Sequence, residues 1–255
     1  MKFVWAIASY NRVNKQYWLQ QLIEWGYSKQ DIIIGVQTSK DYEEYKERWG
    51  AYATIIYRGG QNVSDNKNHI LDYLKDDDRK VVMMSDKVKA IMVLEKQGGK
   101  LRSLGTRQEA ERLLEYIAAT SEQLNGEIAG CYLVPNAFFM SQSIHINQQM
   151  LGCFMVFNAK TKWRFNPQCP LKEDFELIMR IVASGARVVR FNNVALKQTL
   201  HSKGGSYELW NAANDSVNER CCNYILANYP TLVRRHAVRR NEIRYIGPTK
   251  KILLK

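Results

Sequence analysis

The chain has 255 residues, of which 45% are hydrophobic and 24% charged, as is ordinary for a globular protein with its own core. No stretch approaches the roughly 20 apolar residues that a membrane-spanning helix needs, and the N-terminus lacks the apolar run of a signal peptide. The five cysteines show no CxxC spacing, so they support neither a zinc site nor a disulfide framework. We therefore expect a cytoplasmic protein with buried thiols and no membrane partner.

The net charge is +12, and much of it lies near the C-terminus. Residues 231–255 hold eight basic residues and one acidic residue, so they contribute +7 and the rest of the chain contributes 12 − 7 = +5. A concentrated positive charge favours a polyanionic partner. A solvated helix with a basic face is the alternative. The predicted contacts to nucleic acid are Arg234, Arg235, Arg239, Arg240 and Arg244.

Short apolar runs alternate with helical patterns through the first half of the chain. This alternation is typical of a parallel α/β sheet whose strands are buried on both faces. Ligands of such sheets bind beyond the carboxyl ends of the strands. Residues 9–12, 59–68 and 85–89 are therefore predicted to converge on one crevice. The predicted strands are residues 3–8, 31–37, 54–57 and 80–84, and the predicted helices are residues 14–25, 41–49 and 66–74.

The second half has a less regular order of elements. No linker rich in glycine or serine separates the two halves. We therefore predict one continuous domain over residues 1–206, with halves 1–105 and 106–206, followed by a basic helical extension over residues 207–255. The predicted helices are residues 106–123 and 175–183, the predicted strands are residues 130–134, 155–158 and 187–191, and residues 208–229 are mostly helical before Pro230.

Asp86 follows the fourth predicted strand directly, within the run Ser85-Asp86-Lys87. An acidic residue at this place can hold a divalent cation that neutralises a leaving diphosphate. It can also accept a hydrogen bond from a ribose, and an ordinary polar turn is the third interpretation. Lys87 can replace the metal as a fixed positive charge.

Two further motifs carry candidate chemistry. Glu173 and Asp174 stand at the start of an apolar helix, where acids stabilise the helix dipole by under about 1 kcal/mol each. The functional alternative is a general base that removes the proton of an attacking hydroxyl. Downstream, His201-Ser202-Lys203-Gly204-Gly205-Ser206 combines a metal-ligating residue, a cation and a glycine pair. Such a glycine pair lets backbone amides approach an anion, although a plain turn is the alternative.

Taken in order, these motifs resemble the GT-A fold of glycosyltransferases. More narrowly, they resemble the TET-associated glycosyltransferases, a group that includes phage DNA-base glycosyltransferases and the kinetoplastid base J glucosyltransferase. The matching pieces lie between residue 3 and about residue 206. They are Ala8-Ser9-Tyr10-Asn11-Arg12, Asp65-Asn66-Lys67-Asn68, Val81-Val82-Met83-Met84-Ser85-Asp86, Leu151-Gly152-Cys153-Phe154-Met155, Lys172-Glu173-Asp174-Phe175-Glu176-Leu177 and Lys203-Gly204-Gly205-Ser206.

The resemblance implies a GT-A-type, Rossmann-like, mostly parallel sheet flanked by helices, with residues 1–105 as the nucleotide-binding half and residues 106–206 as the acceptor half. It implies a nucleotide-sugar donor such as UDP-glucose, Mn²⁺ or Mg²⁺ where a cation is used, and hydroxymethylated or already glycosylated pyrimidines in duplex DNA as acceptors. Asp174 would be the catalytic base with Glu173 beside it. Asp86 would contact the ribose or a metal, and His201 a metal or the diphosphate. The implied donor contacts are Ser9, Tyr10, Asn11, Arg12, Lys67, Asn68, Asp86, Lys87, Lys203 and Gly204.

Three alternatives stay open at this point. The family usually carries more acids where this chain has Ser85-Asp86-Lys87, so the reaction is either metal-dependent or metal-independent. The acceptor is either a DNA base or a glycan or small molecule. A non-catalytic DNA-binding module on a transferase fold is the third alternative. A phage-encoded enzyme acting in the cytoplasm of its host is what the family implies.

Overall fold

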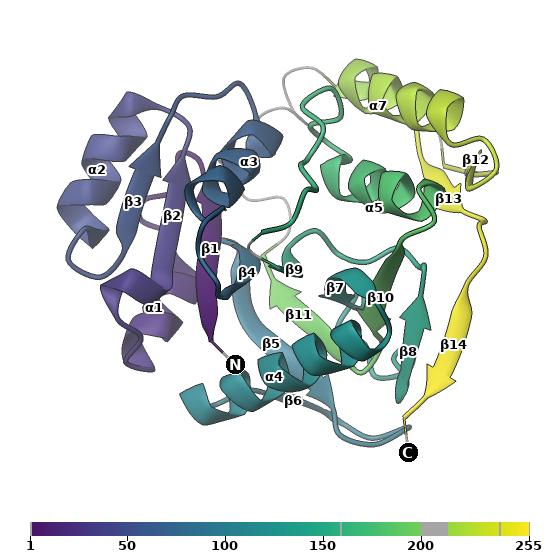
Figure 1. Ribbon diagram of the computed structural model, residues 1–255, viewed down its shortest axis with the longest axis horizontal. Helices are drawn as coiled ribbons and strands as arrows, with labels where there is room; N and C mark the ends of the chain where they lie inside the picture. Colours follow the sequence, from purple (N-terminus) through teal and green to yellow (C-terminus); the bar gives the residue numbers. More distant parts are fainter. Residues whose placement is uncertain (1, 159, 200–213, 240, 255) are drawn as a thin grey trace.

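The computed structural model describes residues 2–158, 160–199, 214–239 and 241–254. Its main feature is one long nine-stranded sheet (Figure 1). Among the described strands of this sheet, β8 and β9 alone run against the others, so seven of the nine strands point the same way and the predicted mostly parallel sheet is confirmed. In spatial order the strands are β14 (Lys250–Leu253), β8 (Ser143–Ile146), β10 (Arg187–Phe191), β7 (Gly126–Cys131), β9 (Phe154–Asn158), β4 (Lys80–Ser85), β1 (Phe3–Ser9), β2 (Ile32–Val36) and β3 (Thr54–Tyr57).

Helices cover both faces of the long sheet, as Figure 1 shows. On β1, Val4 and Ala6 pack on one face while Trp5 and Ile7 pack on the other, because side chains alternate along a strand. One face carries α1 (Tyr17–Glu24), α2 (Ser39–Trp49) and α4 (Arg107–Gln123), and the other carries α3 (Val63–Tyr73), α5 (Glu173–Ala183) and α7 (Asn214–Asn228).

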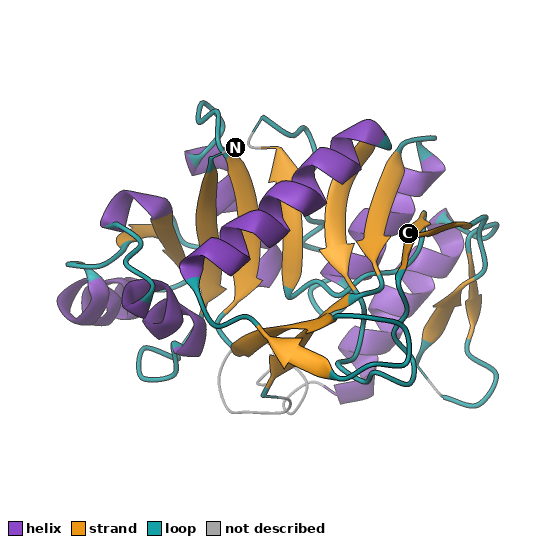
Figure 2. Cartoon of the chain, turned by 90° about the horizontal axis from the view of Figure 1, so that it is seen from below, coloured by secondary structure: helices purple, strands orange, loops and turns teal. Residues whose placement is uncertain are grey.

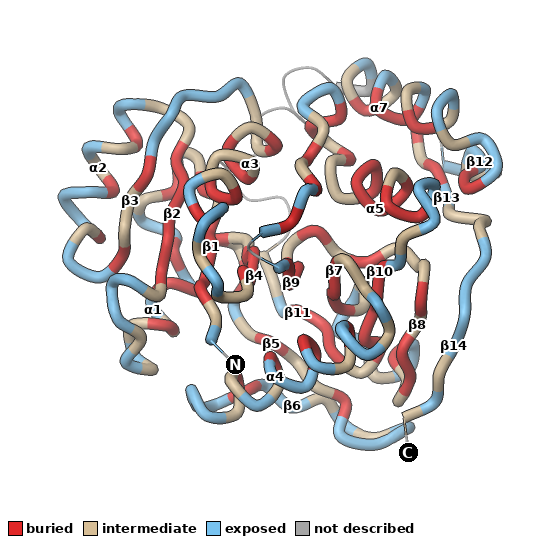
Figure 3. The backbone as a smooth tube through the Cα atoms, viewed as in Figure 1, coloured by how far each residue is buried: buried red, intermediate tan, exposed pale blue. Residues whose placement is uncertain are grey.

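Burial follows this layered arrangement. In Figure 3 the central strands are largely buried, while the outer strand β14 is mostly exposed. Strands β2 and β9 are likewise buried along nearly their whole length, as expected for strands covered by helices on both faces. No helix within the described ranges is long and apolar enough to cross a membrane.

Local sequence signals explain where several helices begin. The side chain of Asn62 accepts hydrogen bonds from the backbone N–H groups of Ser64 and Asp65 and so caps α3. Thr106 and Glu109 form a reciprocal capping box at the start of α4. The first turn of α5 instead carries acids without a side-chain cap, which leaves its N-terminus available for other contacts.

A second, smaller sheet was not predicted from the sequence. It contains β11 (Val194–Gln198), β5 (Val88–Leu94) and β6 (Leu101–Ser103). In Figure 2 this sheet lies beyond the edge of the long sheet to which the parallel strands point. The central strand β5 begins directly after Lys87 and ends at Leu94, so the small sheet extends away from the predicted crevice.

The structure differs from the predicted helical extension after Pro230. The extension is helical in α7, but β12 (Val233–Arg235) and β13 (Ile243–Tyr245) then form a hairpin. Strand β14 pairs with β8 and completes the long sheet. The predicted helix rested on the charge of this segment. The charge of a segment gives no information about its strand partners, and the partner of β14, strand β8, lies more than 100 residues earlier in the chain.

Candidate active site

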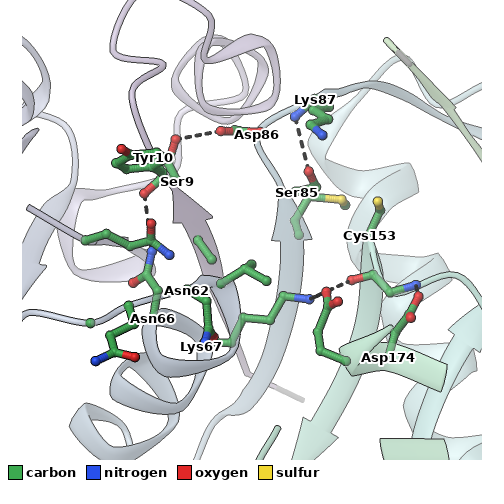
Figure 4. Close-up of a pocket in the computed structure, with 18 of the residues that line it drawn as sticks. Ser9, Tyr10, Asn62, Asn66, Lys67, Ser85, Asp86, Lys87, Cys153 and Asp174 are labelled. Carbon is green, nitrogen blue, oxygen red and sulfur yellow. Dashed lines mark hydrogen bonds and ion pairs between the residues drawn. The ribbon is translucent and has the colours of Figure 1, made fainter. Parts of the chain in front are cut away.

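A cavity of about 420 Å³ opens at the carboxyl edge of the long sheet. Strands β1, β2 and β4 end at this cavity, and helices α3 and α5 begin there (Figure 4). The predicted convergence of three segments is therefore confirmed. The residues of these segments that line the cavity are Ser9, Tyr10, Gly60, Gln61, Asn62, Val63, Asn66, Lys67, Ser85, Asp86 and Lys87, and Gly152, Cys153, Glu173 and Asp174 lie opposite.

We call the side of the cavity that is formed by Ser9, Tyr10 and residues 85–87 the first wall, and the side formed by Gly152, Cys153, Glu173 and Asp174 the second wall. Asp86 is the central carboxylate of the first wall. The Ser9 hydroxyl donates a 2.6 Å hydrogen bond to its Oδ2 atom, and Nη1 of Arg12 lies 3.6 Å from its Oδ1 atom. Arg12 and Asp86 are both buried. Burial raises the pKa of Asp86, against the Arg12 charge and the Ser9 hydrogen bond, which lower it. Both carboxylate oxygens are thus engaged with protein groups.

A buried polar network supports this wall. Gln16 donates hydrogen bonds to the hydroxyls of Ser9 (2.9 Å) and Tyr45 (3.0 Å), and those hydroxyls lie 2.7 Å apart. Asn66 donates to the backbone carbonyls of Ser9 and Gly35, and a Cβ atom on Gly35 would lie 2.4 Å from its Oδ1 atom. Gln16 and Tyr45 were not predicted as site residues, because nothing local marks a residue whose partners are dozens of positions away.

Lys67 occupies the seam between the two walls. Its Nζ atom donates to Oε1 of Glu173 at 3.0 Å and to the carbonyl of Gly152 at 3.4 Å, and it lies 4.6 Å from the centre of the Phe165 ring. Burial lowers the pKa of Lys67, but Glu173 and Asp174 outweigh that effect and raise the pKa above its ordinary value. Lys67 therefore stays charged and joins α3 to α5.

Asp174 is the central carboxylate of the second wall. Its Oδ2 atom accepts the backbone N–H of Gly152 at 2.9 Å, and its Oδ1 atom accepts that of Phe175 at 2.7 Å. Burial and the neighbouring Glu173 charge raise the pKa of Asp174. A Cβ atom on Gly152 would lie 2.5 Å from the Asp174 Cβ atom, so this contact requires glycine. A carboxylate held in this way is suited to accepting a proton.

Lys87 follows Asp86 and lines the same cavity. Burial and the nearby Arg12 charge lower the pKa of Lys87. Lys67 and Lys87 are the two cationic side chains that line this cavity in the described part of the chain. Lys67 is already paired with Glu173, which leaves Lys87 to oppose the charge of an anionic ligand.

The described residues do not fit a metal ion. No group of three or more His, Cys, Asp or Glu side chains among them could hold one. The predicted ligand Asp86 is already engaged by Ser9 and Arg12. The other predicted ligand, His201, lies outside the described residues, as do Lys203, Gly204 and Arg240.

Three predicted donor contacts do not line the cavity. Arg12 directs its guanidinium at Asp86. Asn11 has a φ of 50°, and its backbone N–H donates to the carboxylate of Asp41. Asn68 exchanges two hydrogen bonds with the backbone of Phe165 (2.7 and 2.8 Å) and so holds the loop that covers Lys67.

Four of the five predicted DNA-binding arginines belong to the described residues, and they lie on the hairpin of β12 and β13 and on its loop. Arg234 and Arg244 face each other across the hairpin, and both are exposed. Like charges directly opposite one another destabilise a pair of strands, so an anion bound there would relieve the repulsion. Arg235 lies 3.9 Å from the Glu219 carboxylate, and Arg239 is exposed.

Comparison with known proteins gives one match to a family and several to structures. The family described as TET-Associated Glycosyltransferase matches residues 5–205. No curated protein sequence matches. Among solved structures, S. aureus TarS 1-349, alone and in complex with UDP, is 11% identical with TM-scores of 0.48 and 0.47, over 90% of this chain and 72% of that one. A CMP:2-keto-3-deoxy-manno-octonic acid synthetase complexed with CTP is 8% identical with a TM-score of 0.46, over 78% of this chain and 93% of the other.

The structural similarities are too low to carry an argument about fold or function. The family match is different, because it spans most of the chain and every residue that lines the cavity. On that match, the chain belongs to the TET-associated glycosyltransferase family and is a glycosyltransferase.

Proposed function

We propose that this enzyme moves a sugar from a UDP-sugar, such as UDP-glucose, to a hydroxymethylated or already glycosylated pyrimidine in DNA. The observation that carries the proposal is the cavity at the carboxyl edge of the sheet. Its lining combines two lysines with a pair of adjacent carboxylates from another element. A transferase needs both kinds of group, a cation for the leaving diphosphate and a base for the attacking hydroxyl.

The donor would bind on the first wall. Tyr10 follows β1 and lines the cavity, where its ring offers a flat surface to the base of the nucleotide. Lys87 would lie at the diphosphate. The other lysine of the cavity, Lys67, is already paired with Glu173 at 3.0 Å. A fixed ammonium group stabilises the negative charge that develops on a leaving diphosphate.

The acceptor would meet Asp174. In an inverting displacement, the acceptor hydroxyl forms a bond to the anomeric carbon as the bond from that carbon to the diphosphate breaks. The hydroxyl proton passes to the carboxylate of Asp174, and the diphosphate leaves with the bonding electron pair. The backbone N–H groups of Gly152 and Phe175 hold the carboxylate in place throughout, which limits the reorganisation that the reaction requires.

The DNA acceptor is supported by charge. The net charge of +12 favours a polyanion, and the exposed arginines of the β12–β13 hairpin would contact phosphates without reading sequence. The hydroxymethyl group of a modified pyrimidine provides the attacking hydroxyl.

The test is sugar transfer to DNA that contains 5-hydroxymethylcytosine, with and without prior glucosylation. A panel of UDP-sugars is supplied with Mn²⁺ or with EDTA, and nucleosides are analysed by mass after digestion. We expect one UDP-sugar to add the mass of its sugar to the modified nucleoside, and Asp174→Asn to abolish the product. Persistence of the product in EDTA would assign the role of the cation to Lys87.

Two results would contradict the proposal. Transfer to a glycan or small molecule without transfer to DNA would keep the enzyme class and replace the acceptor. DNA binding with no product and no thermal shift by UDP would indicate a binding module on a transferase fold.

A further inference from the structure

The loop after β7 presents two aromatic side chains to solvent. Phe138 and Phe139 are 86% and 58% exposed, and their ring centres lie 5.1 Å apart in an edge-to-face arrangement. Phe138 is the most exposed of the large aromatic side chains in the described ranges. Adjacent exposed rings of this size mark an interaction site more often than isolated ones do.

The loop holds these rings in a defined position. Asn136 accepts hydrogen bonds from the backbone N–H groups of Phe138, Phe139 and Met140. Met140 is buried in a small apolar cluster with Leu94 of β5 and Ala195 of β11. The same turn therefore buries one side chain and exposes its two neighbours, so the exposure follows from the packing of the loop.

The loop lies at the same edge of the sheet as the cavity. β7 and β4 point the same way and are separated by β9 alone, so their carboxyl ends lie about 10 Å apart. The small sheet connects the two places. The backbone N–H of Thr199 donates to the carbonyl of Lys87 at the cavity end, and that of Tyr132 donates to the carbonyl of Val194 at the loop end. The seven residues of β5 span about 20 Å between these ends.

The surface between the two places is positively charged. Residues 128–158 contain no Asp, Glu, Lys or Arg. The one acid of residues 88–103 and 194–199, Glu95, is paired with Arg102. The turn between β5 and β6 is tied to the aromatic loop by a hydrogen bond from Gln142 to Gln97. The exposed lysines of this surface are Lys96, Lys100 and Lys197.

We propose that Phe138 and Phe139 stack on bases of the acceptor DNA, which lies across the small sheet with its phosphates on these lysines. The inference rests on the proposed DNA acceptor and names the surface that receives it. Aromatic rings interleaved with lysines suit a ligand that is both polyanionic and built of flat bases. When a target nucleotide flips out of the duplex into the cavity, the rings would also stack on the bases that the flipped nucleotide leaves behind.

The test compares Phe138→Ala/Phe139→Ala with Tyr73→Ala. Tyr73 is 53% exposed, but it ends α3 and so lies at the opposite edge of the sheet. Fluorescence anisotropy measures the Kd for a duplex that contains 5-hydroxymethylcytosine, and 2-aminopurine beside the modified base reports unstacking. We expect the double variant to bind more weakly by about 5- to 150-fold for each stacked base, and to lose the rise in 2-aminopurine fluorescence. Tyr73→Ala should match the parent enzyme.

A second variant tests the lysines. Lys96→Gln/Lys100→Gln removes two charges from an exposed turn, so folding should be unaffected. If both lysines contact phosphates, the slope of log K against log salt should fall by about 2. An unchanged slope would remove this turn from the DNA-binding surface.

The outcomes separate this inference from the proposed function. If the parent enzyme glycosylates DNA and the phenylalanine variant binds and reacts like the parent, Phe138 and Phe139 do not bind the acceptor DNA, while the proposed function stands. If the parent enzyme neither binds nor glycosylates DNA, the acceptor itself is overturned and the surface with it. If the double variant instead loses binding to phosphatidylserine vesicles and keeps its affinity for DNA, the rings serve a membrane surface and the inference is wrong.

Discussion

The two walls of the cavity each hold a carboxylate, and their surroundings differ. Asp86 lies between a hydroxyl and a guanidinium, and Gln16 and Tyr45 support that arrangement. Asp174 accepts two backbone N–H groups and has a second carboxylate, Glu173, beside it. Burial raises the pKa of both groups. At Asp86 the Arg12 charge and the Ser9 hydroxyl oppose the rise. At Asp174 the Glu173 charge adds to the rise, while the Lys67 charge and the two backbone N–H groups oppose it.

The difference indicates that Asp86 and Asp174 have separate roles, and we call this the division between the two carboxylates. A carboxylate that is enclosed by its own cation has little freedom to bind a metal or take a proton, and so it fixes the position of its neighbours. A buried carboxylate beside a like charge takes up a proton more readily, and the two backbone donors of Asp174 act against this effect without cancelling it. In the proposed function, the motif after β4 therefore forms the donor side of the cavity, and the motif that opens α5 supplies the catalytic base. The substitutions that follow test this division.

The largest effect is expected for Asp174→Asn. The amide keeps an oxygen for one of the two backbone N–H groups and cannot accept a proton at neutral pH, so kcat should fall about 10²- to 10⁴-fold. Single-turnover transfer and a thermal shift with UDP would separate catalysis from donor binding, which should persist. If Asp174→Asn stays active while Glu173→Gln does not, the role of base belongs to Glu173.

Arg12→Met should act on stability. It leaves the Asp86 carboxylate buried without its cation, so the free energy of unfolding should drop by about 3–5 kcal/mol. Urea denaturation measures this change, with the exposed Arg112→Met as a control expected to stay within about 0.5 kcal/mol of the parent. Adding Asp86→Asn should restore part of the loss. An additive double variant would show that the two side chains do not interact.

Gly152→Ala should test whether the position of the Asp174 carboxylate matters for catalysis, because it moves that carboxylate without changing its chemistry. The new methyl group would overlap the Asp174 side chain, and displacing that carboxylate by about 1 Å should reduce kcat about 10²-fold. The melting temperature should change much less than kcat, because the strain can relax toward the open cavity. Equal losses of stability and activity would instead indicate general unfolding of the 151–153 turn.

Cys153 gives the smallest expected effect. Burial raises its pKa to about 11, so at neutral pH it holds about 300-fold less thiolate than a free cysteine with a pKa of about 8.5. Alkylation by iodoacetamide, followed by intact mass, should be correspondingly slow and should accelerate as pH rises toward 11. Cys153→Ser should keep its activity within a few-fold. Rapid labelling at pH 7 would place a reactive thiol in the active site.

The features that were predictable from sequence follow one rule. In a parallel sheet the carboxyl ends of strands share an edge, so the sequence alone was enough to bring Ser9, Lys67 and Asp86 together. The helix-opening pair Glu173 and Asp174 was predicted as a motif, and its place opposite them emerged only in the fold.

Contacts that depend on distant parts of the chain were not predictable. Neighbours in sequence were expected to share a role, yet Lys67 lines the cavity while Asn68, one position on, holds a loop. Gly152 belongs to a motif, but the reason that this position requires glycine is the side chain of Asp174, 22 positions later in the chain. The segment after Pro230 was judged by its charge, and its strands depend on partners in the hairpin and in β8.

The way β14 completes the long sheet affects how the basic C-terminal segment can be manipulated. Residues 250–253 cover the outer side of β8. Cutting them away would expose a row of unpaired N–H and C=O groups, which is a template for intermolecular strand pairing. A shortened protein that precipitated, or lost DNA binding, would then report aggregation and not the loss of basic contacts. Charge-removing substitutions at the exposed arginines, with the strand left intact, avoid that confusion.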